Sequence, residues 1–305
     1  MSQPVYTLTG GWNVVKMFQY VEETTYGTTP TASPVFVNPG PIVDISDSQE
    51  TQAIKYRMVG SRDIYAMIKT GEAYSFDVTF NPLNTDLLEY AINIPGVGTK
   101  NIGKSLSFVK SQTINGSEMY TIYKGCRADS IDISITADSA VECTVSYICS
   151  DITVPSTSHG LTTPSFAAAP SGTPWTNLDG GVGPLRIGGN AATNIVDTPS
   201  FSASITHNIE QVKPNGTTIV KFVEPTLRDV TFEFDTWHWD TTQITARKNL
   251  TSRVMKYKLH TSAQLDFQES WLESLGMSDS TSDTTPKIES YTGTAKACAV
   301  NTPSW

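Results

Sequence analysis

Cysteine, histidine and basic residues are all scarce in this sequence of 305 residues. There are 4 Cys and 4 His, and 21 Lys and Arg stand against 30 Asp and Glu, which gives a net charge of −9. His159, His207, His238 and His260 are far apart, and none has a second His or Cys at the spacing of a metal site. The sequence therefore predicts no bound metal.

The chain also lacks the short motifs that accompany catalysis and cofactor binding. It has no glycine-rich dinucleotide fingerprint, no Walker loop, no G-x-S-x-G elbow and no H-E-x-x-H pair. No acid/base pair or nucleophile stands in a recognisable setting. We therefore expect no enzyme activity, no catalytic residue and no cofactor.

The sequence also lacks long apolar runs, and it lacks the clusters of Lys and Arg that bind nucleic acid. No segment approaches the roughly 18 to 20 apolar residues that a membrane helix needs, and the first residues do not have the basic and apolar regions of a signal peptide. Residues 1–153 hold 10 basic and 16 acidic residues, and the remainder holds 11 and 14. Neither half is suited to clamp nucleic acid. We expect a chain made in a cytoplasm, with no membrane segment.

Serine and threonine are abundant instead, with 31 Ser and 41 Thr beside 21 Gly and 17 Pro. This composition favours strands and turns over long helices. Residues 74–80 alternate strictly, with Tyr74, Phe76, Val78 and Phe80 on one face, which predicts a half-buried strand. We expect a mainly β fold.

Local signals place further elements in the first half. Residues 12–21 predict an opening strand, and residues 85–92 predict a short helix with a plausible N-cap. The pair Asn115-Gly116 separates two strand-like runs and predicts a hairpin with a type I′ turn. Residues 131–136 and 141–149 alternate in the same way and predict two more strands.

The pattern of the first half recurs in the second. Residues 230–237 can be laid on residues 74–81 at a constant offset of 156, and each run precedes a polar break and a brief helix, here residues 241–249. The second half has no clear counterpart of the Asn115-Gly116 turn. Between the halves, residues 152–183 carry four Pro among Ser, Thr, Ala and Gly, which is typical of a linker.

One segment between two strands is basic and aromatic. Residues 55–69 hold 4 of the 10 basic residues of the first half beside Tyr and Met. Such a segment contacts nucleic acid or protein, or it is a solvated hairpin with no function, and the acidity of the chain favours protein. Two Trp at positions 237 and 239 would share a face of a strand, where they could stack on a sugar or pack on a neighbouring subunit. The candidate contact residues are Lys55, Tyr56, Arg57, Arg62, Ile64, Tyr65, Met67, Lys69, Trp237 and Trp239.

With these elements in place, the chain resembles the tail tube proteins of long-tailed bacterial and archaeal viruses. The resemblance rests on the opening strand that leads into residues 23–30 (ETTYGTTP), on residues 71–80 (GEAYSFDVTF) and on residues 202–210 (SASITHNIE). It implies a β-sandwich or split barrel with one short flanking helix, and the repeat in the sequence predicts two such domains in tandem. The first tube domain with its N-terminal arm would span residues 1–153, the linker residues 154–183, and the second tube domain residues 184–305.

The same resemblance implies a structural protein of the virion tail that is assembled in the host cytoplasm. Its copies would form rings that stack into a tube, with other tail proteins at the ends and double-stranded DNA passing through. Two tube domains per chain favour a trimeric ring, and a hexamer is the alternative. A carbohydrate-binding or adhesin-type β-sandwich module is the competing interpretation, because of the two Trp and the Ser and Thr content.

A closed inner sheet would turn one face of each strand to the sandwich core and the other to the channel. Polar residues that alternate with apolar ones are then candidates to face the lumen, which we expect to be net acidic with no continuous basic track. The alternative is that these carboxylates face bulk solvent. The candidates are Asp77, Thr79, Asp132, Ser134, Thr136, Glu233 and Asp235.

Overall fold

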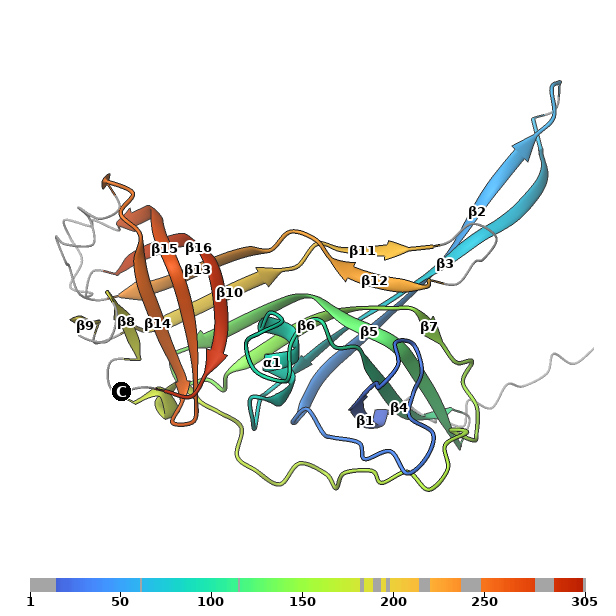
Figure 1. Cartoon of the computed structure of the whole chain (residues 1–305), viewed down its shortest axis with the longest axis horizontal. Helices are drawn as coiled ribbons and strands as arrows, with labels where there is room; N and C mark the ends of the chain where they lie inside the picture. Colours follow the sequence, from blue (N-terminus) through green and yellow to red (C-terminus); the bar gives the residue numbers. More distant parts are fainter. Residues whose placement is uncertain are drawn as a thin grey trace, which may run out of the picture.

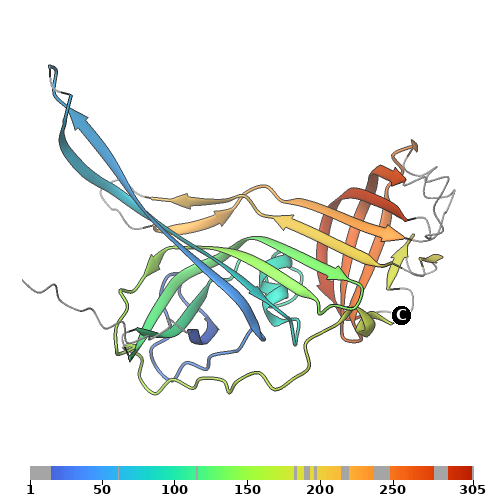
Figure 2. The ribbon, with the colours of Figure 1, turned by 180° about the vertical axis from the view of Figure 1, so that it is seen from behind.

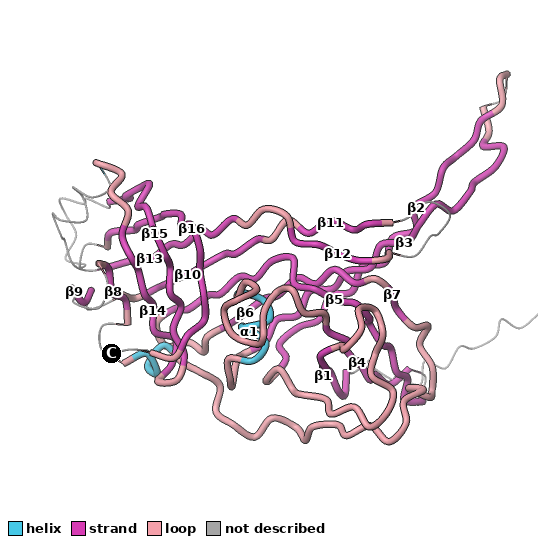
Figure 3. The backbone as a smooth tube through the Cα atoms, viewed as in Figure 1, coloured by secondary structure: helices cyan, strands magenta, loops and turns pink. Residues whose placement is uncertain are grey.

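The computed structural model of the chain describes residues 15–60, 62–114, 116–181, 184–188, 193–195, 198–213, 220–236, 248–277 and 288–303. These residues are mostly strand, as Figure 3 shows, so the mainly β fold expected from the composition is confirmed. The elements are β1 (Val15–Glu22), β2 (Ile42–Arg57), β3 (Ile64–Phe80), α1 (Asp86–Ile92), β4 (Leu106–Ile114), β5 (Ser117–Thr136), β6 (Glu142–Cys149), β7 (Asp151–Ile152), the 3₁₀ helix η1 (Asn177–Gly180), β8 (Leu185–Ile187), β9 (Thr193–Ile195), β10 (Ser200–Thr206), β11 (Ile209–Val212), β12 (Phe222–Pro225), β13 (Asp229–Thr236), β14 (Arg253–His260), β15 (Ala263–Met277) and β16 (Glu289–Asn301).

The first half folds as two layers that share strand β5. One layer has the order β2-β3-β6-β5 and belongs to what we call the long sheet; in the other, the short sheet, β1 pairs with β4, and β4 and β7 pair with β5. β5 passes from one to the other near Gly125, where φ is +61°. A Cβ there would lie 2.2 Å from Ser150 Oγ, so the bend requires glycine. The sequence indicated two separate strands, whereas β5 is continuous through this bend.

An aromatic core fills the space between the two layers. The ring of Phe76 lies 5.1 Å from that of Phe108, 4.7 Å from that of Tyr123 and 5.1 Å from that of Tyr147. The helix predicted over residues 85–92 is α1, and five of its seven residues are buried. It packs against β5 of the first half and β16 of the second, so it joins the two halves as well as covering the core.

The second half repeats the pairing order of the first. The order β8-β14-β15-β16-β13-β10 parallels the order β1-β4-β5-β6-β3-β2. The registers agree too. Ser75 faces Ile148 and Thr231 faces Thr294, while Ser130 faces Ser146 and Ser274 faces Thr292, so β16 follows β6 by 146 residues whether the offset is taken from its pairing with β13 or with β15. The helix expected over residues 241–249 falls largely outside the described residues.

The β14–β15 hairpin stands where the first half has the β4–β5 hairpin. The predicted β4–β5 hairpin is present, with Ile114 opposite Ser117. Its counterpart turns at residues 261–262, a Thr-Ser pair, which left no turn signal in the sequence. Both long strands then continue and carry a register shift at matching places, between Ala128 and Ser130 in β5 and between Leu272 and Ser274 in β15.

The two halves are joined edge to edge. β10 pairs antiparallel with the last part of β5, from Ser200 opposite Thr136 to Thr206 opposite Ser130. The long sheet therefore runs from β2 through β3, β6, β5, β10, β13 and β16 to β15 without interruption (Figures 1 and 2). No local periodicity in the sequence indicates this pairing.

Residues 153–181, most of the predicted linker, lie along residues 31–37 and the short sheet. The backbone N–H of Phe36 donates to the carbonyl of Ser165 at 2.9 Å, and the Gln19 amide donates to the carbonyl of Ala167 at 2.7 Å. The rings of Phe36 and Phe166 pack 5.1 Å apart. The segment is thus held along its length as a strap, and its backbone polar groups are partly satisfied by the chain beneath it.

Candidate functional site

One face of the long sheet is built almost entirely of Ser, Thr, Asp and Glu, and we call it the polar face. Cross-strand neighbours form rows that run across the strands of both halves. The first row reads Asp44, Thr79, Thr144, Asp132, Ser204, Thr231 and Thr294. The second reads Ser46, Asp77, Ser146, Ser130, Thr206 and Asp229, and the third reads Glu142, Ser134, Ser202, Glu233, Thr292 and Ser274.

The residues between these rows point to the opposite side of the sheet and are apolar. One such row reads Ile45, Val78, Val145, Ile131, Ile205 and Val230. All of these except the half-buried Ile45 are buried in the core. Because side chains alternate along a strand, a slip of one residue at any strand would exchange the two faces. The core thus fixes which residues make up the polar face.

The charged residues of the three rows are all acidic, while Lys296, which follows Thr294 by two residues on β16 and so points to the same side, is exposed and forms an ion pair with Glu269. Asp235 accepts hydrogen bonds from Ser200 Oγ at 2.6 Å and Ser290 Oγ at 2.5 Å, while the three rows contain no Lys or Arg. A shallow hollow of about 490 Å³ lies on this face along β5, β10, β13 and β16. The exposed carboxylates of the face include those of Asp44, Glu50, Asp77, Asp132, Glu142, Asp229, Glu233 and Glu273.

The structure places the seven residues predicted to face a channel on this single face. They come from β3, β5 and β13, which the long sheet brings together, and they are Asp77, Thr79, Asp132, Ser134, Thr136, Glu233 and Asp235. Their polar neighbours on β6, β10 and β16 were not predicted, although residues 142–149 and 200–206 carry the same alternation. The missed residues include Thr144, Ser146, Ser202, Ser204, Thr292 and Thr294.

A second feature is the long hairpin of β2 and β3, whose outer half projects beyond the rest of the described chain (Figure 1). The predicted basic segment lies at its end, and strand pairing extends to Arg57 opposite Ile64, so most of the segment is strand rather than loop. Large apolar side chains stand exposed there, with Tyr65 at 72%. We call residues 54–69 the hairpin tip; its exposed apolar side chains are Ile54, Tyr56, Met58, Val59, Ile64, Tyr65, Met67 and Ile68.

The hairpin tip also carries four basic side chains. Lys69 forms an ion pair with Glu72, and hydrogen bonds from Lys69 and Tyr74 lower the pKa of the Glu72 carboxyl. Within the described chain no ion pair involves the other three, Lys55, Arg57 and Arg62. The two remaining predicted contact residues, Trp237 and Trp239, lie outside the described residues.

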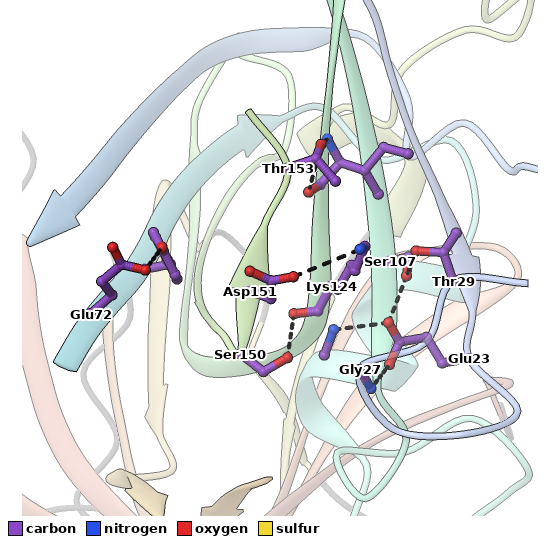
Figure 4. A network of polar contacts seen from close by, with 12 residues as sticks. Glu23, Gly27, Thr29, Glu72, Ser107, Lys124, Ser150, Asp151 and Thr153 are labelled. Atoms are coloured by element: carbon purple, nitrogen blue, oxygen red, sulfur yellow. Dashed lines mark hydrogen bonds and ion pairs between the residues drawn. The ribbon is translucent and has the colours of Figure 1, made fainter. Parts of the chain in front are cut away.

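Glu23, in the ETTYGTTP segment, has a structural role that the sequence did not predict. Its buried carboxylate accepts hydrogen bonds from the backbone N–H groups of Gly27 and Gly125, both at 2.8 Å. The Ser107 hydroxyl donates to it at 2.6 Å (Figure 4), and the Ser105 hydroxyl donates to it at 2.7 Å. Four donors compensate the burial of the charge, and they fix the loop after β1 against the bend of β5.

His207 ties the junction of the two halves to α1. Its ring Nε2–H donates to the carbonyl of Ala91 at 2.7 Å, and its backbone N–H donates to the carbonyl of Asp129 at 2.7 Å. Burial lowers the pKa of the ring from 6.5 to about 4, and the charge of Arg228 acts in the same direction. The imidazole is therefore neutral at physiological pH.

We expect the free energy of unfolding to fall as the pH falls from 6.5 towards 4. In that window the unfolded chain binds a proton at His207 that the folded chain does not bind. The free energy of unfolding therefore falls by about 1.4 kcal/mol per pH unit, and by about 3 kcal/mol in all. Urea unfolding of the wild-type chain and His207→Gln at pH 7 and pH 4.5 measures this. The substitution should remove that part of the pH dependence, and an equal loss in both proteins would rule out His207 as its source.

No three His, Cys, Asp or Glu side chains of the described residues group into a metal site. Among the described helices, none is long and apolar enough to cross a membrane. The conspicuous surfaces are an acidic sheet face, a projecting hairpin with exposed apolar side chains, and sheet edges. Such surfaces are typical of a structural protein that assembles with others.

Comparison with known families agrees with this class. The family model described as phage tail tube protein matches residues 17–295, so the chain belongs to the phage tail tube protein family. The protein is therefore a structural component of the virion tail that assembles with its own copies into a tube and joins other tail proteins. No curated protein matches the chain closely enough to count as a relative.

Proposed function

We propose that copies of this chain close into rings, that the rings stack into the tail tube, and that the polar face of the long sheet lines the channel for the double-stranded genome. The observation that carries the proposal is the composition of that face. Three rows from strands of both halves consist of Ser, Thr, Asp and Glu without a single Lys or Arg. Assembly in the host cytoplasm is part of the same proposal.

The charge of the polar face suits a duplex that must slide. Lys and Arg side chains bind DNA tightly by releasing the counterions of its phosphates, which would hold the genome in place. Carboxylates repel the phosphates weakly instead. Hydroxyl groups keep the wall hydrated without binding a particular sequence. A wall of this kind would lower the friction on a passing genome.

The repeated pairing order supports two tandem tube domains, residues 1–153 and 184–305, connected by residues 154–183. Each would give four strands to the inner wall, β2-β3-β6-β5 from the first and β10-β13-β16-β15 from the second. Six such sets around an axis need three chains. At about 4.8 Å per strand, roughly 24 strands give a circumference of about 115 Å and a diameter of about 37 Å between backbones, which admits a hydrated duplex.

Rings of the purified protein are expected to contain three chains. Mass photometry should then show particles of about 100 kDa, three times the 33.2 kDa of one chain, and end-on electron micrographs should look six-fold because each chain fills two positions. Six chains per ring would overturn the tandem-domain argument in favour of the hexamer. A protein that stays monomeric and forms neither rings nor tubes would overturn the proposed function.

The hairpin tip is proposed to contact a subunit of the adjacent ring. Its apolar side chains are exposed in the single chain, and burying them on assembly would stabilise the contact. The basic side chains would meet acidic groups of the neighbour. The proposed contact residues are Lys55, Tyr56, Arg57, Arg62, Ile64, Tyr65, Met67 and Lys69, together with Trp237 and Trp239 outside the described residues.

A further inference from the structure

Two strands of the long sheet have an unpaired edge in the part of the chain that the structure describes. β2, with 16 residues, is the first strand of the sheet, and among the described strands it pairs with β3 alone. β15 pairs with β14 as far as Ser270, and the rest of that edge, up to Met277, has no backbone partner among the described residues. Long edges of this kind are templates for pairing with another chain unless something covers them.

The junction inside the chain shows how such edges fit together. Beyond its hairpin with β4, the last part of β5 pairs with β10, and Asp132 stands opposite Ser204. In the repeated pairing pattern β15 corresponds to β5 and β2 corresponds to β10. The two unpaired edges are therefore the counterparts of the two strands that pair at the internal junction.

Each pair of corresponding strands is separated by a fixed number of residues. Phe232 of β13 corresponds to Phe76 of β3, 156 residues earlier. Their partners are Ala203 and Asp47, so β10 also follows β2 by 156 residues. The register shift at residues 128–130 of β5 corresponds to the shift at residues 272–274 of β15. Residues of β15 therefore follow their counterparts in β5 by 144 positions. The counterpart of Ser204 is then Ser48, and that of Asp132 is Gly276.

We infer that β2 of one copy pairs antiparallel with β15 of a second copy in the register of the internal β5–β10 junction. Ser48 of one copy then lies opposite Gly276 of the other, with Gln49 opposite Leu275 and Glu50 opposite Ser274. The inference rests on the proposed ring and identifies its closing contact. Around a trimer, junctions within chains and between chains would alternate with the same geometry.

The side of the sheet to which each side chain points supports this register. Ser48 lies on the polar face, because it follows Ser46 by two residues on β2. Ser274 lies on the polar face as well, since its hydroxyl is 2.5 Å from that of Thr292, and Gly276 follows it by two residues. The pairing therefore continues the polar face from one chain into the next, whereas a slip of one residue would place core positions of one chain opposite polar positions of the other.

Disulfide trapping tests the register. Ser48→Cys combined with Gly276→Cys is expected to give covalent dimers and trimers when assembled protein is oxidised and run on a denaturing gel. Gly276 accepts a side chain, since a Cβ there would only be in ordinary contact, 3.8 Å from Ser290. The four native cysteines are buried, so they do not compete.

Two matched variants serve as controls. Asp132→Cys with Ser204→Cys has the same geometry inside one chain, so its two introduced thiols should be oxidised while the protein runs as a monomer on the gel. Ser46→Cys with Ser274→Cys also uses two polar-face positions, but in the inferred register they are four residues apart, about 13 Å along the strands, so they should stay reduced.

The outcomes separate the register from the proposed function. If micrographs show tubes but the Ser48/Gly276 pair stays reduced while the internal pair oxidises, the inferred register is wrong and the tube assignment stands. Cross-linking of the Ser46/Ser274 pair instead would also overturn the register. If none of the variants nor the wild-type chain forms rings or tubes, it is the proposed function that fails.

Discussion

Changing Lys55, Arg57 and Arg62 together to Glu is expected to abolish stacking of the rings while each subunit still folds. The three side chains are exposed at the hairpin tip, and within the described chain no ion pair involves them, so the fold loses no salt bridge. On a chain with a net charge of −9 they form a local basic surface. Reversing their sign would replace attraction to an acidic neighbour by repulsion at every hairpin of the ring.

The measurement is the length of assemblies in electron micrographs, with circular dichroism to show that the variant is folded. Rings without tubes are expected for the triple Glu variant. Lys248, Arg253 and Lys258, which lie in or just before β14, offer a control with the same change of net charge away from the hairpin tip. Tubes of normal length are expected from that control variant.

The apolar part of the hairpin tip can be tested separately. Tyr65→Ser and Met67→Ser keep the charge and remove side chains that are exposed in the single chain, so the subunit should keep its stability while stacking weakens. If tubes of normal length form from both the charge-reversed and the serine variants, the hairpin tip does not hold the rings together.

Local alternation predicts much of this fold and of the polar face. Asp77 and Thr79 stand between the core residues Phe76, Val78 and Phe80, and period-two patterning is enough to assign them to the opposite face of the strand. The same reasoning assigns the polar residues of β5 and β13. A polar break followed by helical spacing likewise predicts α1.

What alternation cannot predict is which strands are neighbours. The pairing of β5 with β10 joins residues about 70 positions apart in the chain, and nothing in either strand alone specifies the partner. The bend at Gly125 depends on the nearby Ser150 and on the buried Glu23, which are also distant in sequence. Long-range packing thus decides the sheet order, while local pattern decides only the faces.

Contacts with residues distant in sequence also fix the position of residues 153–181. Their Pro, Ser and Thr content is typical of a linker, and composition reports only that they form no regular strand of their own. The strap is held by Phe36, Gln19 and the cluster of Phe36, Val109 and Ile122 beneath it. A segment with little periodicity can therefore be well fixed when residues elsewhere supply its hydrogen bonds and its apolar contacts.

Placing lysines on the polar face is expected to slow passage of the genome without preventing assembly of the tube. Asp77→Lys, Asp132→Lys and Glu233→Lys each change an exposed side chain on that face, and the alternate positions that make the core are untouched. In stacked rings they would give the channel a repeated basic track. New phosphate contacts would hold the duplex, and we expect ejection of DNA from virions built with the variant to slow by about tenfold or more at low salt.

The matched variant carries Asn at positions 77 and 132 and Gln at position 233, which removes the carboxylates and adds no positive charge. Its ejection rate should stay close to that of the wild-type virion, because the repulsion of a carboxylate wall is weak. The lysine variant should recover as the salt concentration rises, since counterion release then favours binding less. Tubes that eject DNA at the wild-type rate despite the lysines, at low as well as high salt, would contradict a channel lined by the polar face. An atomic structure of the tube whose inner wall carries mostly Lys and Arg would do the same, while leaving the family assignment unchanged.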